Sequence, residues 1–240
     1  AAAALIVFIV RELRCENPLL NLKLLGERNF GVSMAVLAIF GIGMLGGTYL
    51  LPLYMQKGLG YTAIMAGSVF LPVGLIQGVL STCSGFLTRY VKPLFIAVTG
   101  ILVMTLSFYF ASRFTLHTTH AQIMLVLYLR GFGMGLTFAP LNDFSLMNLS
   151  QCDMASAGIS NSIKQLSGSV SIALLTVILT GRTAFHSAQG GLSSAESYVA
   201  GISDDFLFVT FVSLASALPF LWLLRPRRKA ASFKSEGTGT

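Results

Sequence analysis

One apolar stretch of the chain carries an arginine together with several glycines and a proline: LRGFGMGLTFAPLND, residues 129–143. An arginine in the hydrocarbon layer of a membrane costs about 2.5 kcal/mol or more, so such a residue faces the protein interior or a water-filled cavity. Arg130 is therefore a candidate for a charged residue buried inside the protein. Two roles stay open: a charge used in gating or function, or a buried group that only ties helices together through their carbonyls.

The glycines around Arg130 predict close contact between helices. Gly131 and Gly135 are four residues apart and share one helix face, a spacing that lets a neighbouring helix approach closely. Gly133 points elsewhere and is expected to loosen the helix further. Pro140 removes a backbone hydrogen bond near the end of the span. We expect the close neighbour to shield Arg130 from lipid.

A second mixture of polar and small residues occupies residues 158–180. Asn161, Gln165 and Gly168 lie at i, i+4 and i+7, on one helix face. An adjacent stripe consists of Ser160, Lys164, Ser167 and Ser171. Such a face is suited to helix packing or to lining a water-filled pathway, and both interpretations remain open. Lys164 can extend to the membrane surface or pair with Asp143.

Glycine and proline also interrupt two earlier apolar runs, GIGMLGGTYLLP (41–52) and AGSVFLPVGLIQGVL (66–80). In transporters such interruptions mark helices that bend or line a substrate path. Four residues are candidates to line an adaptable apolar cavity: Tyr49, Tyr54, Phe70 and Gln77. The alternative is that they face lipid or neighbouring helices.

Several kinds of chemistry lack the residues they need. All nine carboxylates fall in predicted loops, at span ends or in the tail, and none lies at mid-membrane, where a proton relay needs one. There is no phosphate-binding Walker loop, so ATP-driven pumping is not encoded. No Ser/His/Asp or Cys/His pair lies at the mouth of a span, and the three cysteines have no metal-ligand spacing. We expect neither an enzyme nor a cofactor.

The elements that must position these residues are membrane-spanning helices. The sequence is 54% hydrophobic and 10% charged, with a mean hydropathy of +0.76, and its long uncharged runs approach the roughly 20 residues that cross a bilayer. An all-α polytopic membrane protein is predicted. Its six spans are expected at about 30–52, 62–84, 94–112, 121–142, 158–180 and 204–224. Residues 1–10 are interpreted as the end of a truncated helix, 11–29 as a cytoplasmic loop and 225–240 as a basic cytoplasmic tail.

The distribution of Lys and Arg predicts the orientation. Eleven of these residues fall in 11–29, 85–93 and the tail, against three, Lys57, Arg113 and Arg182, in the alternate loops. Because the cytoplasmic side carries the excess, the C-terminus is expected in the cytoplasm. The net charge of +7 then reflects topology rather than binding to nucleic acid. The connection 181–203 is predicted to be the longest external loop, with nothing that resembles a binding site.

Four stretches together resemble a known family: ENPLLNLKLLGERNF (16–30), LPLYMQKGLGYTAIMAGSVFLPVG (51–74), RGFGMGLTFAPLND (130–143) and SNSIKQLSGSVSIALL (160–175). Their order and spacing resemble the C-terminal half of the fourteen-helix drug:proton antiporters of the major facilitator superfamily, the EmrB/QacA type. The resemblance implies a six-helix C-terminal bundle preceded by the end of a linker helix. It also implies residence in the plasma (inner) membrane.

The resemblance also implies roles for particular residues. Arg130 resembles the counterpart of the arginine in the fourth helix of the N-terminal half, which the family links to proton coupling. Gly85, Arg89 and Lys92 look like a degenerate copy of a basic cytoplasmic loop that lacks its usual acidic residue. The acidic proton carrier and the antiporter motif of the family would belong to the missing half.

The function predicted from these features is the C-terminal half of a proton-coupled multidrug efflux transporter. It would export small amphipathic or lipophilic compounds by alternating access, with the proton gradient as its energy source. The implied partners are the bilayer, the N-terminal half, a drug-like substrate and a periplasmic adaptor protein. The alternatives are a major facilitator carrier for a specific metabolite or anion, and a non-transporting membrane scaffold. These 240 residues alone are not expected to transport.

Overall fold

The computed structural model describes residues 28–146, 157–188, 191 and 193–223, and side chains within 38–140, 161–162, 165–188, 191 and 193–216. Its helices are α2 (Arg28–Leu53), α3 (Ala63–Leu87), α4 (Pro93–Ala111), α5 (His120–Leu146), α6 (Ala157–Ala188) and α7 (Ser194–Leu223). Within these ranges all regular structure is helical, and six helices are long and apolar enough to cross a membrane. The predicted fold class is confirmed. The predictions for 1–10 and 225–240, and for all of the 11–29 loop except its last two residues, lie outside the described residues, and residues 28 and 29 already belong to α2.

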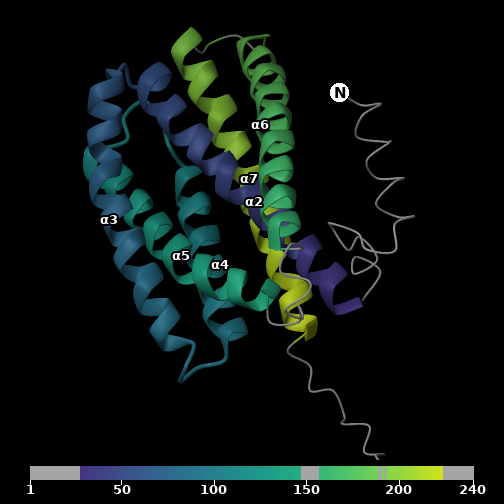
Figure 1. The fold of residues 1–240 in the computed structure, drawn as a ribbon. Helices are drawn as coiled ribbons and strands as arrows, with labels where there is room; N and C mark the ends of the chain where they lie inside the picture. Colours follow the sequence, from purple (N-terminus) through teal and green to yellow (C-terminus); the bar gives the residue numbers. More distant parts are fainter. Residues whose placement is uncertain (1–27, 147–156, 189–190, 192, 224–240) are drawn as a thin grey trace, which may run out of the picture.

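The helices pack as a bundle of two groups, α3 with α4 and α5, and α2 with α6 and α7 (Figure 1). Helix α5 packs between α3 and α4, and α2 packs against α6 and α7. Helix α4 contacts both α5 and α7, so it joins the two groups. Arg130 on α5 can therefore reach α2, which also contacts α5.

The crossing of α4 and α5 is a contact between two backbones. Gly100 and Gly133 face each other there, and a Cβ added to Gly133 would lie 2.7 Å from the carbonyl oxygen of Gly100 and 2.7 Å from the amide of Met104. Thr137 Oγ1 donates to the Gly133 carbonyl at 2.7 Å. Only glycine leaves room for helices this close, because any other residue would place a side chain between the backbones.

One end of the bundle, where α2, α4 and α6 end and α3, α5 and α7 begin, is held together by aromatic and hydroxyl contacts; we call it the 54–62 end. After α2 the backbone forms a π-helical turn over Tyr54–Gly58. The hydroxyl of Tyr54 donates to the Thr115 carbonyl at 2.7 Å, and its ring stacks on Phe114 at 4.9 Å. Ser203 Oγ donates to the Phe114 carbonyl at 2.9 Å. These contacts tie α2 and α7 to the connection between α4 and α5.

The last two helices extend further at this end than the predicted spans. Helix α6 continues to Ala188 rather than ending near 180, and α7 begins at Ser194 rather than near 204. The prediction of a long loop over 181–203 is therefore wrong. The start of α7 is fixed by a reciprocal cap: Ser193 N donates to Glu196 Oε2 at 2.7 Å, and Glu196 N donates to Ser193 Oγ at 3.2 Å. This Ser-x-x-Glu pattern was readable in the sequence as a capping box.

Candidate functional site

Arg130 lies inside the bundle, with a side chain only 3% exposed. Its Nη2 donates to the carbonyl oxygen of Met44 at 3.2 Å and to the hydroxyl of Thr48, both on α2. Thr48 in turn donates to the same Met44 carbonyl at 2.8 Å. Gly47 lies beside the guanidinium, where an added Cβ would be 3.2 Å from Nε. The guanidinium of Arg130 thus packs against residues 44–48 of α2.

The guanidinium is only partly satisfied within the described part of the chain. Its Nε is buried and has no hydrogen-bond partner there, and no described carboxylate pairs with it. Thr48, which it contacts, is exposed. The charge therefore lies just beneath the surface at the boundary of α2 and α5, with a donor still available. Such an arrangement can attract an anionic or polar group that approaches this surface.

The glycines near Arg130 do bring helices together, but on a different side from the arginine. Gly131 and Gly135 face α3: added Cβ atoms would lie 3.2 Å from the Val73 carbonyl oxygen and 3.0 Å from that of Gln77. Ser84 on α3 donates to the Gly135 carbonyl at 3.2 Å. The expectation that these glycines shield Arg130 directly is wrong, because α2 does so.

Gly133 and Pro140 are also buried. Gly133 faces α4 across the backbone contact described above, so it holds the helix in place instead of loosening it. Pro140 lies inside α5, which continues to Leu146.

The predicted polar face of α6 is exposed at some positions and buried at others. Asn161 and Gln165 are exposed, whereas Gly168 is buried against the side chain of Leu45 on α2. Further along, Ser171 donates to the Ile42 carbonyl at 3.0 Å. The side chains of Asp143 and Lys164 lie outside those described, and their pairing stays a prediction.

The candidate loop residues Gly85, Arg89 and Lys92 lie at the end of α3 and in the connection to α4. Gly85 has open space around it, and Arg89 is exposed, 5.9 Å from the centre of the Phe86 ring. Lys92 is also exposed and immediately precedes α4. Their gating role stays a prediction.

The four candidate cavity residues lie in different surroundings, and their joint lining of a substrate cavity stays a prediction. Tyr49 contributes to a cavity of about 370 Å³ between α2, α6 and α7, and its hydroxyl lies 3.1 Å from Thr176 Oγ1. Tyr54 is a buried core residue, because its ring packs inside the bundle. Phe70 packs against the same core, and Gln77 faces Gly135 from α3.

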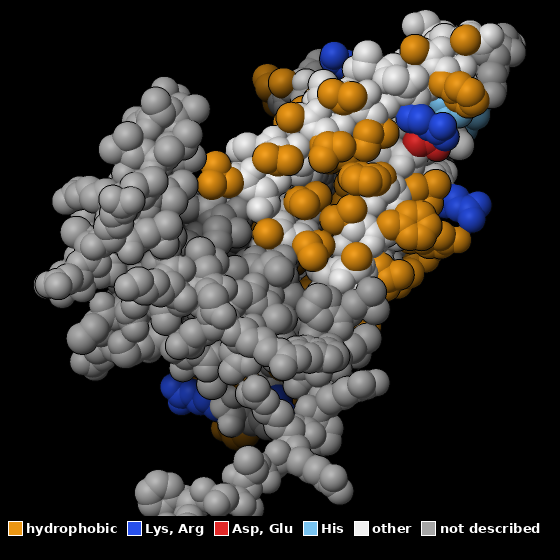
Figure 2. Space-filling model, turned by 90° about the vertical axis from the view of Figure 1, so that its right-hand side faces the viewer, with side chains coloured by type: hydrophobic (Ala, Val, Ile, Leu, Met, Phe, Trp, Pro, Cys, Tyr) orange, Lys and Arg blue, Asp and Glu red, His pale blue; other side chains and the backbone are white. Residues whose placement is uncertain are grey.

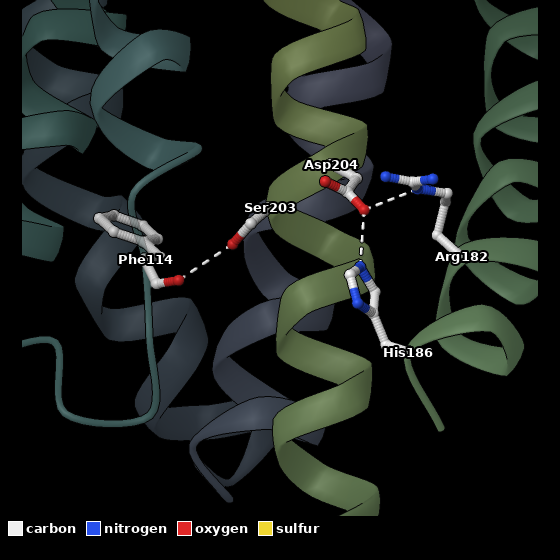
Figure 3. Close-up of polar contacts among 5 residues, drawn as sticks. All are labelled: Phe114, Arg182, His186, Ser203 and Asp204. Atoms are coloured by element: carbon white, nitrogen blue, oxygen red, sulfur yellow. Dashed lines mark hydrogen bonds and ion pairs between the residues drawn. The ribbon is translucent and has the colours of Figure 1, made fainter. Parts of the chain in front are cut away.

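A cluster that the sequence interpretation missed joins α6 to α7 (Figure 3). Asp204 Oδ2 accepts from Arg182 Nε at 2.7 Å and lies 2.8 Å from His186 Nε2. In the view of Figure 2, apolar side chains cover much of the described surface, and basic, acidic and histidine side chains lie together in one place on it. The i, i+4 spacing of Arg182 and His186 and the capping box ahead of Asp204 were the signals that could have revealed this cluster.

These features define a polytopic membrane protein with a buried cation between two of its helices. The chain belongs to the Major Facilitator Superfamily, whose family model matches residues 4–176. The family predicted from the sequence is confirmed, and it is a family of transporters rather than enzymes.

Curated relatives place the chain among members named for drug resistance. It is 32% identical over 189 residues to the uncharacterized MFS-type transporter YhcA of Bacillus subtilis, covering 78% of this chain and 36% of that protein. It is 26% identical over 229 residues to the lincomycin resistance protein LmrB of Listeria innocua, covering 93% and 49%. The multidrug export protein EmrB of Haemophilus influenzae is 30% identical over 191 residues, covering 79% and 38%. The chain thus spans between about a third and a half of the length of these relatives.

Proposed function

We propose that this chain is the C-terminal half of a proton-coupled efflux transporter for small amphipathic or lipophilic compounds. The observation that carries the proposal is Arg130, a guanidinium buried in an otherwise apolar bundle of this family with one donor unused. The names of LmrB and EmrB, which refer to lincomycin resistance and multidrug export, support an efflux role.

The proposed mechanism is alternating access driven by the proton gradient, with no cofactor. This half moves as a unit against the other half, because the α4–α5 and α3–α5 contacts at glycine leave little freedom inside it. The 54–62 end faces the outside, as the excess of Lys and Arg at the opposite end indicates. Arg130 holds the surface of α2 and α5 positive, where it can bind a carboxylate of the other half or a polar group of the substrate.

The test uses the whole transporter that contains this chain, in inside-out membrane vesicles. Arg130→Ala and Arg130→Lys are compared with Arg113→Lys, which changes an exposed arginine whose Nη2 donates to the Tyr109 hydroxyl at 3.0 Å. Since hydrogen bonds to buried charged groups are worth about 1.5–3 kcal/mol, Arg130→Ala should reduce proton-driven drug uptake by about 10- to 100-fold. Arg113→Lys should leave uptake unchanged.

Three results would oppose the proposal. Uptake that persists after the proton gradient is dissipated would exclude proton coupling. Uptake of an anionic metabolite in place of drugs would favour the alternative carrier. Proton-driven transport by the 240 residues alone would show that the other half is not needed.

A further inference from the structure

Asp205 is a buried carboxyl group without a partner in the described part of the chain. Its side chain is 0% exposed, and neither carboxylate oxygen has a hydrogen-bond partner there. The adjacent Asp204 binds Arg182 and His186 instead, because successive residues of a helix point about 100° apart. Burying an unpaired carboxylate costs a large amount of free energy. We therefore expect a proton, a cation or ordered water at this position.

Other unsatisfied atoms lie along the same stretch of α7 and on the part of α6 that faces it. Of five buried side-chain N and O atoms without a partner in the described residues, four belong to Thr183, Ser197 and Asp205. Ser197, Gly201 and Asp205 lie at i, i+4 and i+8 on one face of α7, and a Cβ added to Gly201 would be 2.6 Å from Thr183 Oγ1 on α6. Buried polar atoms that lack protein partners are typically bridged by ordered water. This strip of α7 facing α6 is therefore suited to hold water beside Asp205.

A cavity between α2, α6 and α7 opens beside this strip. The cavity of about 370 Å³ is lined by Thr183 and Tyr198 and also by the exposed residues Lys57 and Thr180. At about 30 Å³ for each molecule, it has room for about ten waters. Tyr198 lies close enough to Asp205 for the two side chains to interact electrostatically. Water in this cavity would thus contact Thr183 and Tyr198, two side chains that border the strip containing Asp205.

The depth of Asp205 favours exchange with one side of the membrane. Ser203 bonds to Phe114, which follows the last residue of α4, Ala111. Asp205 therefore lies nearer to the 54–62 end of the bundle, where the cavity is also found. The opposite end is separated from it by the rest of α7, which continues to Leu223.

We propose that Asp205 is a proton-binding site that is loaded from the 54–62 end through the cavity and the hydroxyl of Thr183. A hydronium ion in the cavity passes its proton along bridging water, an O–H bond forms at one Asp205 oxygen, and a neutral water remains; release reverses these steps. Resting on the proposed function, this inference gives the C-terminal half a carboxyl group of its own on the side that the charge distribution predicts to be external.

The groups around Asp205 leave its charge uncompensated. Arg182 and His186 of α6 are bound to Asp204, and Lys57 lies 5.9 Å from the ring centre of Tyr198. The remaining titratable groups at this end are Tyr49, Tyr54, Tyr61, Tyr109, Arg113, His117, His120 and Glu196. None of these forms a described ion pair with Asp205. Loading and unloading a proton therefore changes the local net charge, and the contacts of α7 with α2 and α6 can respond to it.

The test measures the proton directly, by infrared difference spectroscopy of the whole transporter in lipid nanodiscs as the pH is lowered from neutral to mildly acidic. Asp205→Asn should remove one carboxylic-acid C=O band per chain, and Asp205→Glu should shift that band. The matched control is Glu196→Gln, which neutralises an exposed carboxylate on the same helix. It should keep the band. Thermal unfolding checks that each variant folds, and Asp205→Asn is expected to be at least as stable because it removes an unpaired buried carboxyl.

The outcomes separate this inference from the proposed function. If Asp205→Asn keeps every titrating band while efflux is proton-driven, the proton site is wrong and the proposed function stands. If the band is lost in Asp205→Asn but efflux is independent of the proton gradient, the site stands and the proposed function fails. A band that sodium ions, rather than pH, displace would identify a cation site and overturn the inference.

Discussion

Replacing Gly133 with alanine tests whether the backbone contact between α4 and α5 holds this bundle together. The added Cβ would lie 2.7 Å from both the Gly100 carbonyl oxygen and the Met104 amide, where ordinary contacts are about 3.5–4.0 Å. Both neighbours are backbone atoms, so the helices must separate by close to 1 Å. Overpacking of this kind costs about 1–3 kcal/mol.

The matched control is Gly78→Ala on α3, where an added Cβ meets nothing within 4 Å. Alanine is favoured over glycine in a helix by about 1 kcal/mol, so this variant should be slightly more stable than the parent. Because the same gain applies to Gly133→Ala, the two variants should differ by the overpacking cost, about 1–3 kcal/mol in the free energy of unfolding, measured by denaturant titration in detergent micelles. Equal stability of Gly133→Ala and Gly78→Ala would refute the claim that the α4–α5 crossing depends on glycine.

Three further changes probe contacts elsewhere in the bundle. Ser84→Ala removes the bond to the Gly135 carbonyl and should lower the free energy of unfolding by about 0.6 kcal/mol, whereas Ser68→Ala, which affects an exposed bond within α3, should have a smaller effect. Ser193→Ala removes the cap of α7 and should cost about 1 kcal/mol locally, seen as faster hydrogen exchange of the amides of 195–197 with no change in α4. Asp204→Asn breaks the contacts with Arg182 and His186. Because the cluster is partly exposed, this variant should change the free energy of unfolding by less than about 1 kcal/mol. A larger loss would show that the cluster holds α6 to α7.

The spans could be predicted from the sequence because length and hydropathy alone decide which helices can cross a bilayer. The uncharged runs gave the number of helices and their order. The ends of α6 and α7 could not be found in this way, because Arg182, His186 and Asp204 interrupt the apolar pattern without interrupting the helix. Their charges are satisfied by one another across the two helices, a compensation that hydropathy does not record.

The sequence allowed us to predict which residues belong to the candidate site, but not which helices they contact. The burial of Arg130 follows from its place in an apolar run, and the use of Gly131 and Gly135 in close packing follows from their spacing. Which helix each would meet depends on the rotation of α5, which a single sequence does not specify. The contacts of Arg130 with Met44 and Thr48 could not be predicted for the same reason, and the Met44 acceptor is a backbone carbonyl, which every residue has. Asp205 was placed at the end of a predicted span, because the adjacent Asp204 made the pair look like the polar start of that span.

The 54–62 end has a practical consequence for experiments on this family member. Helix α6 has 32 residues and α7 has 30, so at about 1.5 Å per residue they measure about 48 and 45 Å, against a hydrocarbon core of about 30 Å. Even a 40° tilt would leave several ångströms of ordered helix outside the lipid. An antibody fragment raised against this rigid part would bind without entering the bilayer. It would add a recognisable mass for particle alignment in electron cryomicroscopy, and a fragment that touches both helices would report whether their ends move during transport.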